Sequence, residues 1–196
     1  WFLTDTNNVR HGPFGWVISS APAPQTKALL PQEFVGYEWI SATKLQGCYS
    51  LMLGFSEDLK LNWNAAKVKN SPIEWMAVDS SKPSRDSDYS LLVQTSNEWA
   101  ESRIEDDQDH VRVMLLDEVE RLLERRIKNA VYTSLHRWCY ANTSADENLD
   151  NIGYFIDQKL KLAACGDWCV EGHVESAFLS ARSLALTLKS QLLSDF

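Results

Sequence analysis

Short stretches of apolar residues, interrupted by polar ones, recur along the chain and predict β-strands. Alternation of this kind is typical of half-buried strands. The stretches lie at 15–21, 48–55, 73–78, 89–95 and 131–140. Pro22 and Pro24 follow the first of them and end it abruptly, because proline offers no backbone N–H to a strand ladder. Residues 25–30 are then expected to form one or two helical turns.

Two longer segments repeat apolar residues every three or four positions, as one face of an α-helix requires. The first, at about 106–129, has acidic residues at its start and basic residues at its end, which complements the helix dipole. Its apolar stripe comprises Val111, Met114, Leu115, Val119, Leu122 and Leu123. The charged ends therefore predict a solvated helix surface rather than a binding site.

The second helix is predicted at about 174–193, near the C-terminus. Its apolar residues at helical spacing are Val174, Ala177, Phe178, Ala181, Leu184, Ala185, Leu188 and Leu192. The small side chains of Ala177, Ala181 and Ala185 are expected to let the helix pack closely on a sheet or a cofactor. Strands joined by short loops, one long central helix and one terminal helix predict a mixed α/β (α+β) fold with a largely antiparallel sheet.

Composition narrows the class of protein. The 196 residues suffice for one domain or slightly more, and 44% apolar against 23% charged residues predicts a folded core. The net charge of −8 disfavours nucleic-acid binding, which normally needs a basic surface. No signal peptide and no apolar run near the ~20 residues of a membrane span is visible, so no membrane partner is expected. The chain begins at Trp1, which favours a truncated or processed product.

The four cysteines predict a reducing, cytoplasmic location, because their positions show no disulfide framework spacing. Cys48 and Cys139 lie in strand patterns, where we expect buried apolar side chains. Cys165, Cys169 and His173 are spaced as on one helix face. However, a glycine breaks the helix there and a fourth ligand is lacking, so no metal site is predicted.

The segment before the C-terminal helix predicts a short buried strand, a Gly166-Asp167-Trp168 turn and a polar loop. Gly166 permits a tight turn, and a carboxylate at a strand end can accept hydrogen bonds from ribose or ribityl hydroxyls. The unpaired N–H groups where the helix opens, near Gly172 or His173, can face a negatively polarised ligand atom. The alternative is an ordinary turn in which Asp167 caps the helix, and the tripeptide alone favours it.

The whole stretch 165–185 resembles the C-terminal FAD-contacting motif of flavin-containing amine oxidoreductases, and most of all their renalase-like bacterial branch. Further segments resemble the same family, in the same order along the chain. They are 16–25 with its Pro-Ala-Pro-Gln turn, 71–75 with 81–83, 96–99 and 136–141. Several co-linear matches are more specific than any one of them.

The resemblance implies a two-domain flavoprotein that passes hydride from a small amine or a nicotinamide-like substrate to FAD. Residues 1–30 and 150–196 would form part of a Rossmann-type FAD-binding domain, and 31–149 a substrate domain. By the same resemblance, Asp167 binds the ribityl chain and the start of the last helix faces the flavin N1–C2=O edge. The cofactor contacts implied are Gly166, Asp167, Trp168, Gly172, His173, Val174 and Glu175.

The chain departs from the family pattern in ways that bear on the cofactor. Ser176 and Ala181 stand where the family usually has glycine, and Gln94 where the relatives tend to have histidine. No G-x-G-x-x-G motif opens the chain, since no helix is predicted after Gly12-Pro-Phe-Gly15. We therefore expect FAD in the parent protein, with an N-terminal Rossmann segment of that protein as partner. Weak or no FAD binding is expected from these residues alone.

Aromatic side chains on the predicted strand 131–140 form the candidate substrate pocket. His136, Trp138 and Tyr140 share one face at a period of two, and Trp75 is expected to approach from a neighbouring strand. An ordinary half-buried sheet face fits the same pattern. His136 is more typical of a structural histidine than of a catalytic base, and no catalytic residue is predicted. The alternative function is a non-catalytic binding or interaction module that keeps the fold without flavin chemistry.

Overall fold

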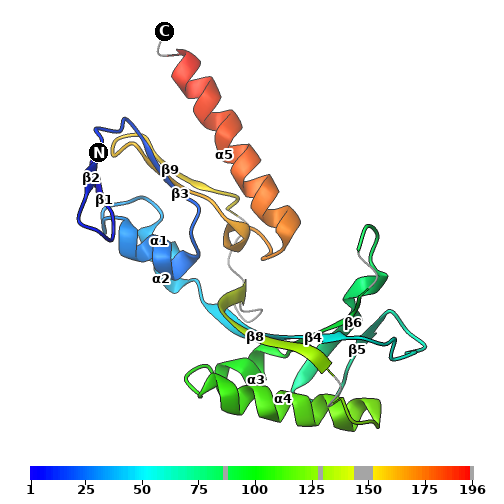
Figure 1. Cartoon of the computed structure of the whole chain (residues 1–196). Coiled ribbons are helices and arrows are strands. Elements are labelled where there is room, and N and C mark those ends of the chain that lie inside the picture. The colour runs from blue at the N-terminus through cyan, green and yellow to red at the C-terminus, as the bar shows by residue number, and fades with distance from the viewer. Residues whose placement is uncertain (86–87, 128–129, 144–151, 195–196) are drawn as a thin grey trace. The chain divides into compact units, whose positions relative to one another are not determined.

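The computed structural model describes residues 1–85, 88–127, 130–143 and 152–194 (Figure 1). The chain divides into two compact units: unit 1 contains Trp1–Leu45 and Asn142–Phe196, and unit 2 contains Gln46–Ala141. The predicted boundaries, after residue 30 and before residue 150, differ from these, and residue 150 lies outside the described residues. The assignment of one part to a cofactor and the other to a substrate stays a prediction.

Unit 1 is built on a three-stranded sheet of order β3-β10-β9. Its strands are β3 (Val17–Ser19), β9 (Phe155–Asp157) and β10 (Leu162–Ala164). β10 pairs in parallel with β3 and antiparallel with β9. The other elements are β1 (Leu3–Thr4), β2 (Arg10–His11), α1 (Ala23–Leu29), α2 (Tyr37–Ala42), η2 (Asp167–Cys169) and α5 (Val174–Ser194). The strand predicted within 15–21, the helical turns that follow it and the C-terminal strand and helix are thereby confirmed.

Both faces of the central strand β10 are covered, because successive side chains of a strand point to opposite sides. Ala163 and Cys165 pack against Leu184 and Leu188 of α5. Leu162 belongs to a second core that it shares with residues of α1 and α2. The turn after β10 is thus held between two packed layers.

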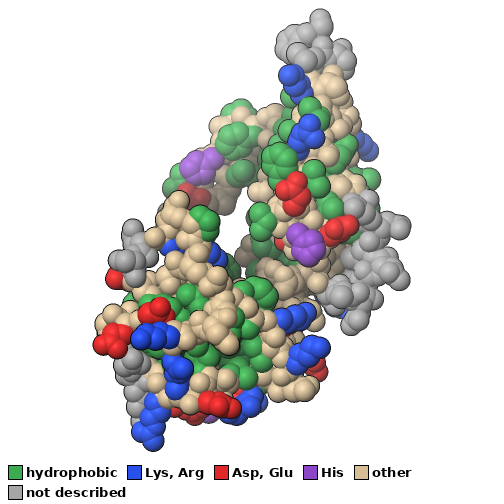
Figure 2. Space-filling model, turned by 90° about the vertical axis from the view of Figure 1, so that its right-hand side faces the viewer, with side chains coloured by type: hydrophobic (Ala, Val, Ile, Leu, Met, Phe, Trp, Pro, Cys, Tyr) green, Lys and Arg blue, Asp and Glu red, His purple; other side chains and the backbone are tan. Residues whose placement is uncertain are grey.

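Helix α5 packs through only part of the stripe that its apolar pattern predicts. Its buried side chains are Ser176, Ser180, Leu184 and Leu188, of which Leu184 and Leu188 belong to the predicted stripe. Val174 and Phe178 are 92% and 60% exposed, and Ala181 and Ala185 are exposed as well, so these two small residues do not pack on the sheet. Their close packing on a cofactor stays a prediction. Figure 2 shows hydrophobic side chains uncovered along this helix, at the upper right. Among the described residues no helix has both the length and the apolar character needed to cross a membrane.

Unit 2 contains a five-stranded sheet of order β5-β6-β7-β4-β8. Its strands are β4 (Leu45–Phe55), β5 (Ala65–Lys67), β6 (Ile73–Val78), β7 (Tyr89–Thr95) and β8 (Ala130–Thr143). The β5–β6, β6–β7 and β7–β4 pairs are antiparallel, which confirms the predicted sheet. Figure 1 shows α3 (Asn97–Glu101) and α4 (Gln108–Leu123) on one face of the sheet.

Helix α4 supplies the predicted apolar stripe to the core of unit 2 but ends earlier than predicted. Its buried residues are Val111, Leu115 and Val119. The helix stops at Leu123 because Glu124 takes a left-handed conformation with φ 50°. Arg125 therefore lies beyond the helix, where its guanidinium donates to the Leu59 carbonyl at 2.6 Å. Of the predicted helix end, 128 and 129 lie outside the described residues.

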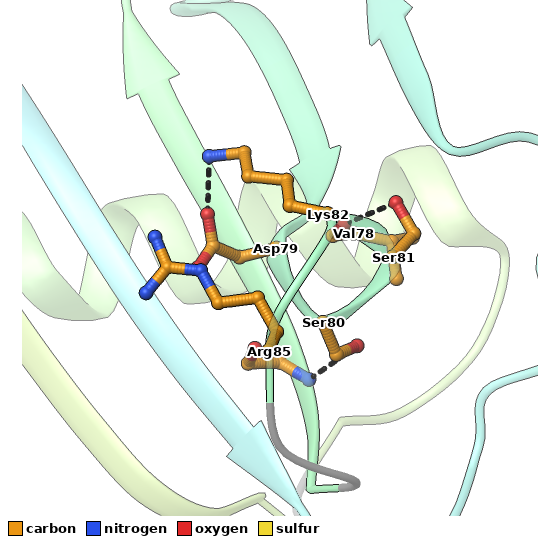
Figure 3. Close-up of polar contacts among 7 residues, drawn as sticks. Val78, Asp79, Ser80, Ser81, Lys82 and Arg85 are labelled. Carbon is orange, nitrogen blue, oxygen red and sulfur yellow. Dashed lines mark hydrogen bonds and ion pairs between the residues drawn. The ribbon is translucent and has the colours of Figure 1, made fainter.

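The polar segment that follows β6 is tied down by one carboxylate (Figure 3). It begins with the short helix η1 (Asp79–Ser81). The Asp79 carboxylate is hydrogen-bonded and ion-paired to Lys82, and its other oxygen lies 3.6 Å from Arg85 Nε. The hydrogen bond from Lys82 lowers the pKa of Asp79. The turn is therefore a structural ion-pair cluster at the end of a strand.

Candidate functional site

The face of the unit 2 sheet that α3 and α4 leave uncovered carries the predicted substrate-pocket residues. Strand alternation sends Tyr49 and Leu51 of β4 into the core with the helices. The intervening Ser50 therefore belongs to the opposite side, as do Gln94 on β7 and Trp75 on β6 through their register. We call this side of the sheet the open face.

A row of four side chains crosses the open face from β6 to β8. In the strand register Trp75 is paired with Gln94, and Gln94 is paired with Ser50. The indole Nε1 of Trp138 donates a hydrogen bond to the Ser50 hydroxyl at 3.1 Å. We call Trp75, Gln94, Ser50 and Trp138 the aromatic row, since an indole stands at each end.

The remaining predicted pocket residues flank Trp138 on β8. His136 and Tyr140 lie two positions before and after it, so alternation places them on the open face as well. The His136 ring packs edge-on against Trp138, with ring centroids 4.1 Å apart. Trp75, Trp138 and Tyr140 are 39%, 51% and 43% exposed. All four predicted residues thus share one face, although two strands separate Trp75 from Trp138.

Sequence reasoning missed the middle of the aromatic row. The motifs do not single out Ser50, and Gln94 stands out only as a departure from a family pattern. Alternation within 48–55 and 89–95 places both on the side away from the apolar core, and that signal could have found them. Ser50 is only 5% exposed because the Trp138 indole covers it.

In unit 1, the turn after β10 is anchored by its tryptophan. Trp168 is 2% exposed, and its indole Nε1 donates to the Ala21 carbonyl at 3.0 Å. Its ring stacks with Phe155, with ring centroids 6.4 Å apart at 19°. The Trp168 side chain therefore supports the turn from inside the core, and any contact that this residue makes with a ligand has to come from its backbone.

Asp167 closes its own turn rather than capping the long helix. Its Oδ1 accepts a hydrogen bond from the Trp168 N–H at 3.0 Å, and its carbonyl accepts from the N–H groups of Val170 and Gly172, both at 3.0 Å. α5 begins only at Val174. Among the described residues, no group donates a hydrogen bond to the second carboxylate oxygen, Oδ2. Asp167 is half-buried, and this oxygen is the part of the turn that a ligand can use.

The predicted contact residues after the turn form the exposed start of α5. Gly172 has a left-handed φ of 76°, which lets the chain reverse into the helix. His173, Val174 and Glu175 are all exposed. The first hydrogen bond of the helix, from Ala177 N–H to the His173 carbonyl, spans 3.1 Å. The backbone N–H groups of the first helical residues therefore precede the helical ladder.

The four cysteines differ in exposure, and the expectation of a buried Cys139 is wrong. Cys139 lies on the edge strand β8 and is exposed, whereas the other three thiols are buried. Burial raises the pKa of Cys169 to about 12.

We expect iodoacetamide near pH 8 to label Cys139 in the native protein and the other cysteines only after unfolding. Peptide mass spectrometry measures this, and Cys139→Ser should abolish native labelling. Rapid native labelling of Cys169 would contradict the structure.

No protein-family model matches the chain. Among solved structures, it is similar to a protein assigned as a protoporphyrinogen oxidase from Exiguobacterium sp. 255-15, with a TM-score of 0.70 and 11% identity over 90% of this chain and 41% of that one. A putrescine oxidase double mutant matches with a TM-score of 0.64 and 15% identity, over 89% of this chain and 42% of that one. An oxidoreductase from Methanosarcina mazei matches with a TM-score of 0.60 and 12% identity, over 94% of this chain and 47% of that one. The chain therefore has the fold of these oxidoreductases and spans less than half of their length. The predicted amine-oxidase-like architecture is confirmed at the level of fold, and the renalase-like branch stays a prediction.

Proposed function

We propose that the chain is the C-terminal part of an FAD-dependent oxidoreductase of the amine-oxidase type, with the cofactor site in unit 1 and the substrate site in unit 2. The observation that supports this most is the end of β10. There Asp167 stands in a turn that leads to the exposed start of α5, within an oxidoreductase fold. When bound, the flavin supplies the chemistry, since it accepts a hydride from the substrate. The proposed donor is a small amine or a nicotinamide-like molecule.

The described residues of unit 1 fit the flavin end of such a cofactor. Asp167 Oδ2 can accept a hydrogen bond from a ribityl hydroxyl. The N–H groups of Val174 and Glu175 precede the α5 ladder and can face a negatively polarised oxygen. Ser176, which replaces a family glycine, is only 4% exposed. Its side chain therefore packs into unit 1 and leaves the end of the helix open to a ring.

The proposed partner is an N-terminal Rossmann segment of the same protein. Ile18 on the edge strand β3 is 49% exposed, and Val174, Phe178 and Leu186 of α5 are exposed as well. A cavity of about 470 Å³ beside β3 has mostly apolar lining, including Phe2, Leu29 and Leu162. Proteins seldom leave neighbouring apolar side chains exposed without a partner. The exposed residues and the apolar cavity therefore support a segment that covers them. The four free thiols agree with the proposed cytoplasmic location.

Asp167→Asn in the full-length parent tests the proposed function. Asparagine keeps the oxygen that accepts from Trp168, so the turn is retained, but the negative charge is lost. We expect FAD binding to weaken roughly tenfold or more, as for loss of a hydrogen bond to a charged group. The ratio of flavin absorbance to protein after purification and titration with FAD measures this. Asp109→Asn, at a 77% exposed carboxylate on α4, is the matched control and should leave flavin content unchanged.

Two results would count against this function. A wild-type parent that is colourless and gains no flavin absorbance on addition of FAD would favour the non-catalytic module instead. Normal flavin content in Asp167→Asn would show that another residue makes the ribityl contact.

A further inference from the structure

The unit 2 sheet ends, in the part of the chain that the structure describes, on one long strand edge without a neighbour. The sheet order makes β5 and β8 its two end strands. β5 is three residues long and carries Lys67, and short length and lysine are two ways in which proteins prevent further strand pairing. β8 is fourteen residues long and contains neither lysine nor proline. The edge of β8 therefore lacks these protections.

The one arginine of β8 does not protect this edge either. Arg137 reaches towards the segment between α3 and α4, where its guanidinium donates to the Ile104 carbonyl at 2.6 Å. Large apolar side chains stay exposed along the strand, since Val131, Tyr132 and Trp138 are 72%, 58% and 51% exposed. An end strand also presents a row of unpaired backbone N–H and C=O groups. Such an edge is suited to the addition of a further strand.

Helix α4 provides a wall beside this edge. A cavity of about 320 Å³ lies between α4 and β8, which are neighbours in Figure 1. Its lining includes Thr133 of β8 and one flank of α4, formed by Val113, Leu116, Asp117 and Glu120. A strand added to β8 would direct alternate side chains towards this flank, because successive side chains of a strand point to opposite faces.

The lining of this cavity combines apolar and acidic side chains. Val113 is 53% exposed although it is apolar. Asp117 is exposed and, among the described residues, forms no hydrogen bond or ion pair. Glu120 accepts from the Ile127 N–H at 2.9 Å, and no cation of the described residues pairs with it. A lysine or arginine side chain satisfies both kinds of lining, with its aliphatic stem on Val113 and its charged head near Asp117.

We propose that β8 pairs with an extended segment of the parent protein that lies outside these residues, and that this segment places a lysine or arginine over the cavity beside Asp117. The chain spans 41% and 42% of two structures of the same fold, so a parent of that length contains other residues that can supply a strand. The proposal rests on the proposed parent but not on its flavin chemistry. It concerns unit 2, whereas the Rossmann segment is proposed to cover unit 1.

Hydrogen exchange at single-residue resolution in the full-length parent tests the added strand. A strand paired on one side protects alternate amides, and a strand paired on both sides protects successive ones. We expect successive amides within 132–140 to exchange roughly tenfold or more below the unprotected rate. Protection of alternate amides only would overturn the proposal. Protection that is lost on dilution would assign the edge to a second copy of the protein and would overturn it as well.

Asp117→Lys in the parent tests the basic side chain of the segment. Like charges then meet over the cavity, and we expect the outward amides of β8 to exchange roughly fivefold or more faster. Glu57→Lys, at an exposed position after β4, makes the same change of charge and should leave their exchange unaltered. Unaltered exchange in Asp117→Lys would overturn the choice of a basic segment. Neither measurement uses flavin, so a colourless parent would overturn only the proposed redox function.

Discussion

Replacing Gly166 with alanine is expected to lower the free energy of unfolding by about 3 kcal/mol, the upper end of the usual cost of overpacking. A Cβ at this position would lie 2.3 Å from Nε1 and 2.7 Å from Cδ1 of Trp168. The indole cannot move aside cheaply, because it is buried and its N–H donates to the Ala21 carbonyl. Chemical denaturation followed by circular dichroism measures the change.

Two further glycines separate the steric cost from backbone strain. The φ of Gly166 is 168°, an extended conformation open to any residue, so its cost is steric alone. Gly153 has a left-handed φ of 81° and nothing within 4 Å, so Gly153→Ala should cost about 1 kcal/mol from the backbone alone. Gly15 has nothing within 4 Å and no left-handed φ, so Gly15→Ala should be close to neutral. A Gly166→Ala protein as stable as Gly15→Ala would mean that the indole is not packed against the turn.

The Gly-Asp-Trp turn therefore divides its work among three residues. Gly166 leaves room for the indole, and Trp168 fastens the turn to the loop that follows β3. Asp167 uses one carboxylate oxygen to close the turn, and the other receives no hydrogen bond from the described residues. If the proposed function holds, Trp168 acts on the cofactor site through the turn and not by contact, and its substitution would reduce binding through loss of the turn.

Periodicity predicted most of the secondary structure, because alternation and three-to-four spacing reflect which side of an element is buried. It failed to identify the buried side of the first half of α5. The buried stripe contains Ser176 and Ser180, which no hydrophobic pattern selects. Ser180 can be buried because both a backbone N–H and a carbonyl reach its hydroxyl from elements distant in sequence. Contacts of this kind depend on the tertiary structure and are invisible in a single sequence.

The same limit explains what could be predicted of the candidate site. The aromatic residues of β8 followed from alternation within one strand. Their relation to Trp75 depends on strand order, in which β7 and β4 intervene. The residue that follows the end of α4 likewise makes a contact distant in sequence, the hydrogen bond of 2.6 Å from the Arg125 guanidinium to the Leu59 carbonyl. Local patterns therefore predicted which side chains share a face, and only the fold determined their neighbours.

Replacing Ser180 with alanine is expected to lower the free energy of unfolding by about 2 kcal/mol, because it leaves two buried polar groups without a hydrogen-bond partner. The Ser180 hydroxyl accepts from the Gly166 N–H at 3.0 Å and donates to the Gly153 carbonyl. Ser180 is 1% exposed, so water cannot replace it without opening the turn. We expect faster hydrogen exchange at the Gly166 amide together with a lower midpoint of denaturation.

Ser190 provides the matched control for this substitution on the same helix. Its hydroxyl is exposed and donates only to the Thr187 carbonyl within α5, at 2.8 Å. Ser190→Ala should change stability by less than about 0.5 kcal/mol, as is usual for surface positions. If Ser180→Ala and Ser190→Ala are equally stable and exchange at Gly166 is unchanged, Ser180 does not hold the turn. If Ser180→Ala alone is destabilised, the serine that positions Asp167 lies thirteen residues further along the chain, in the helix that the turn leads into.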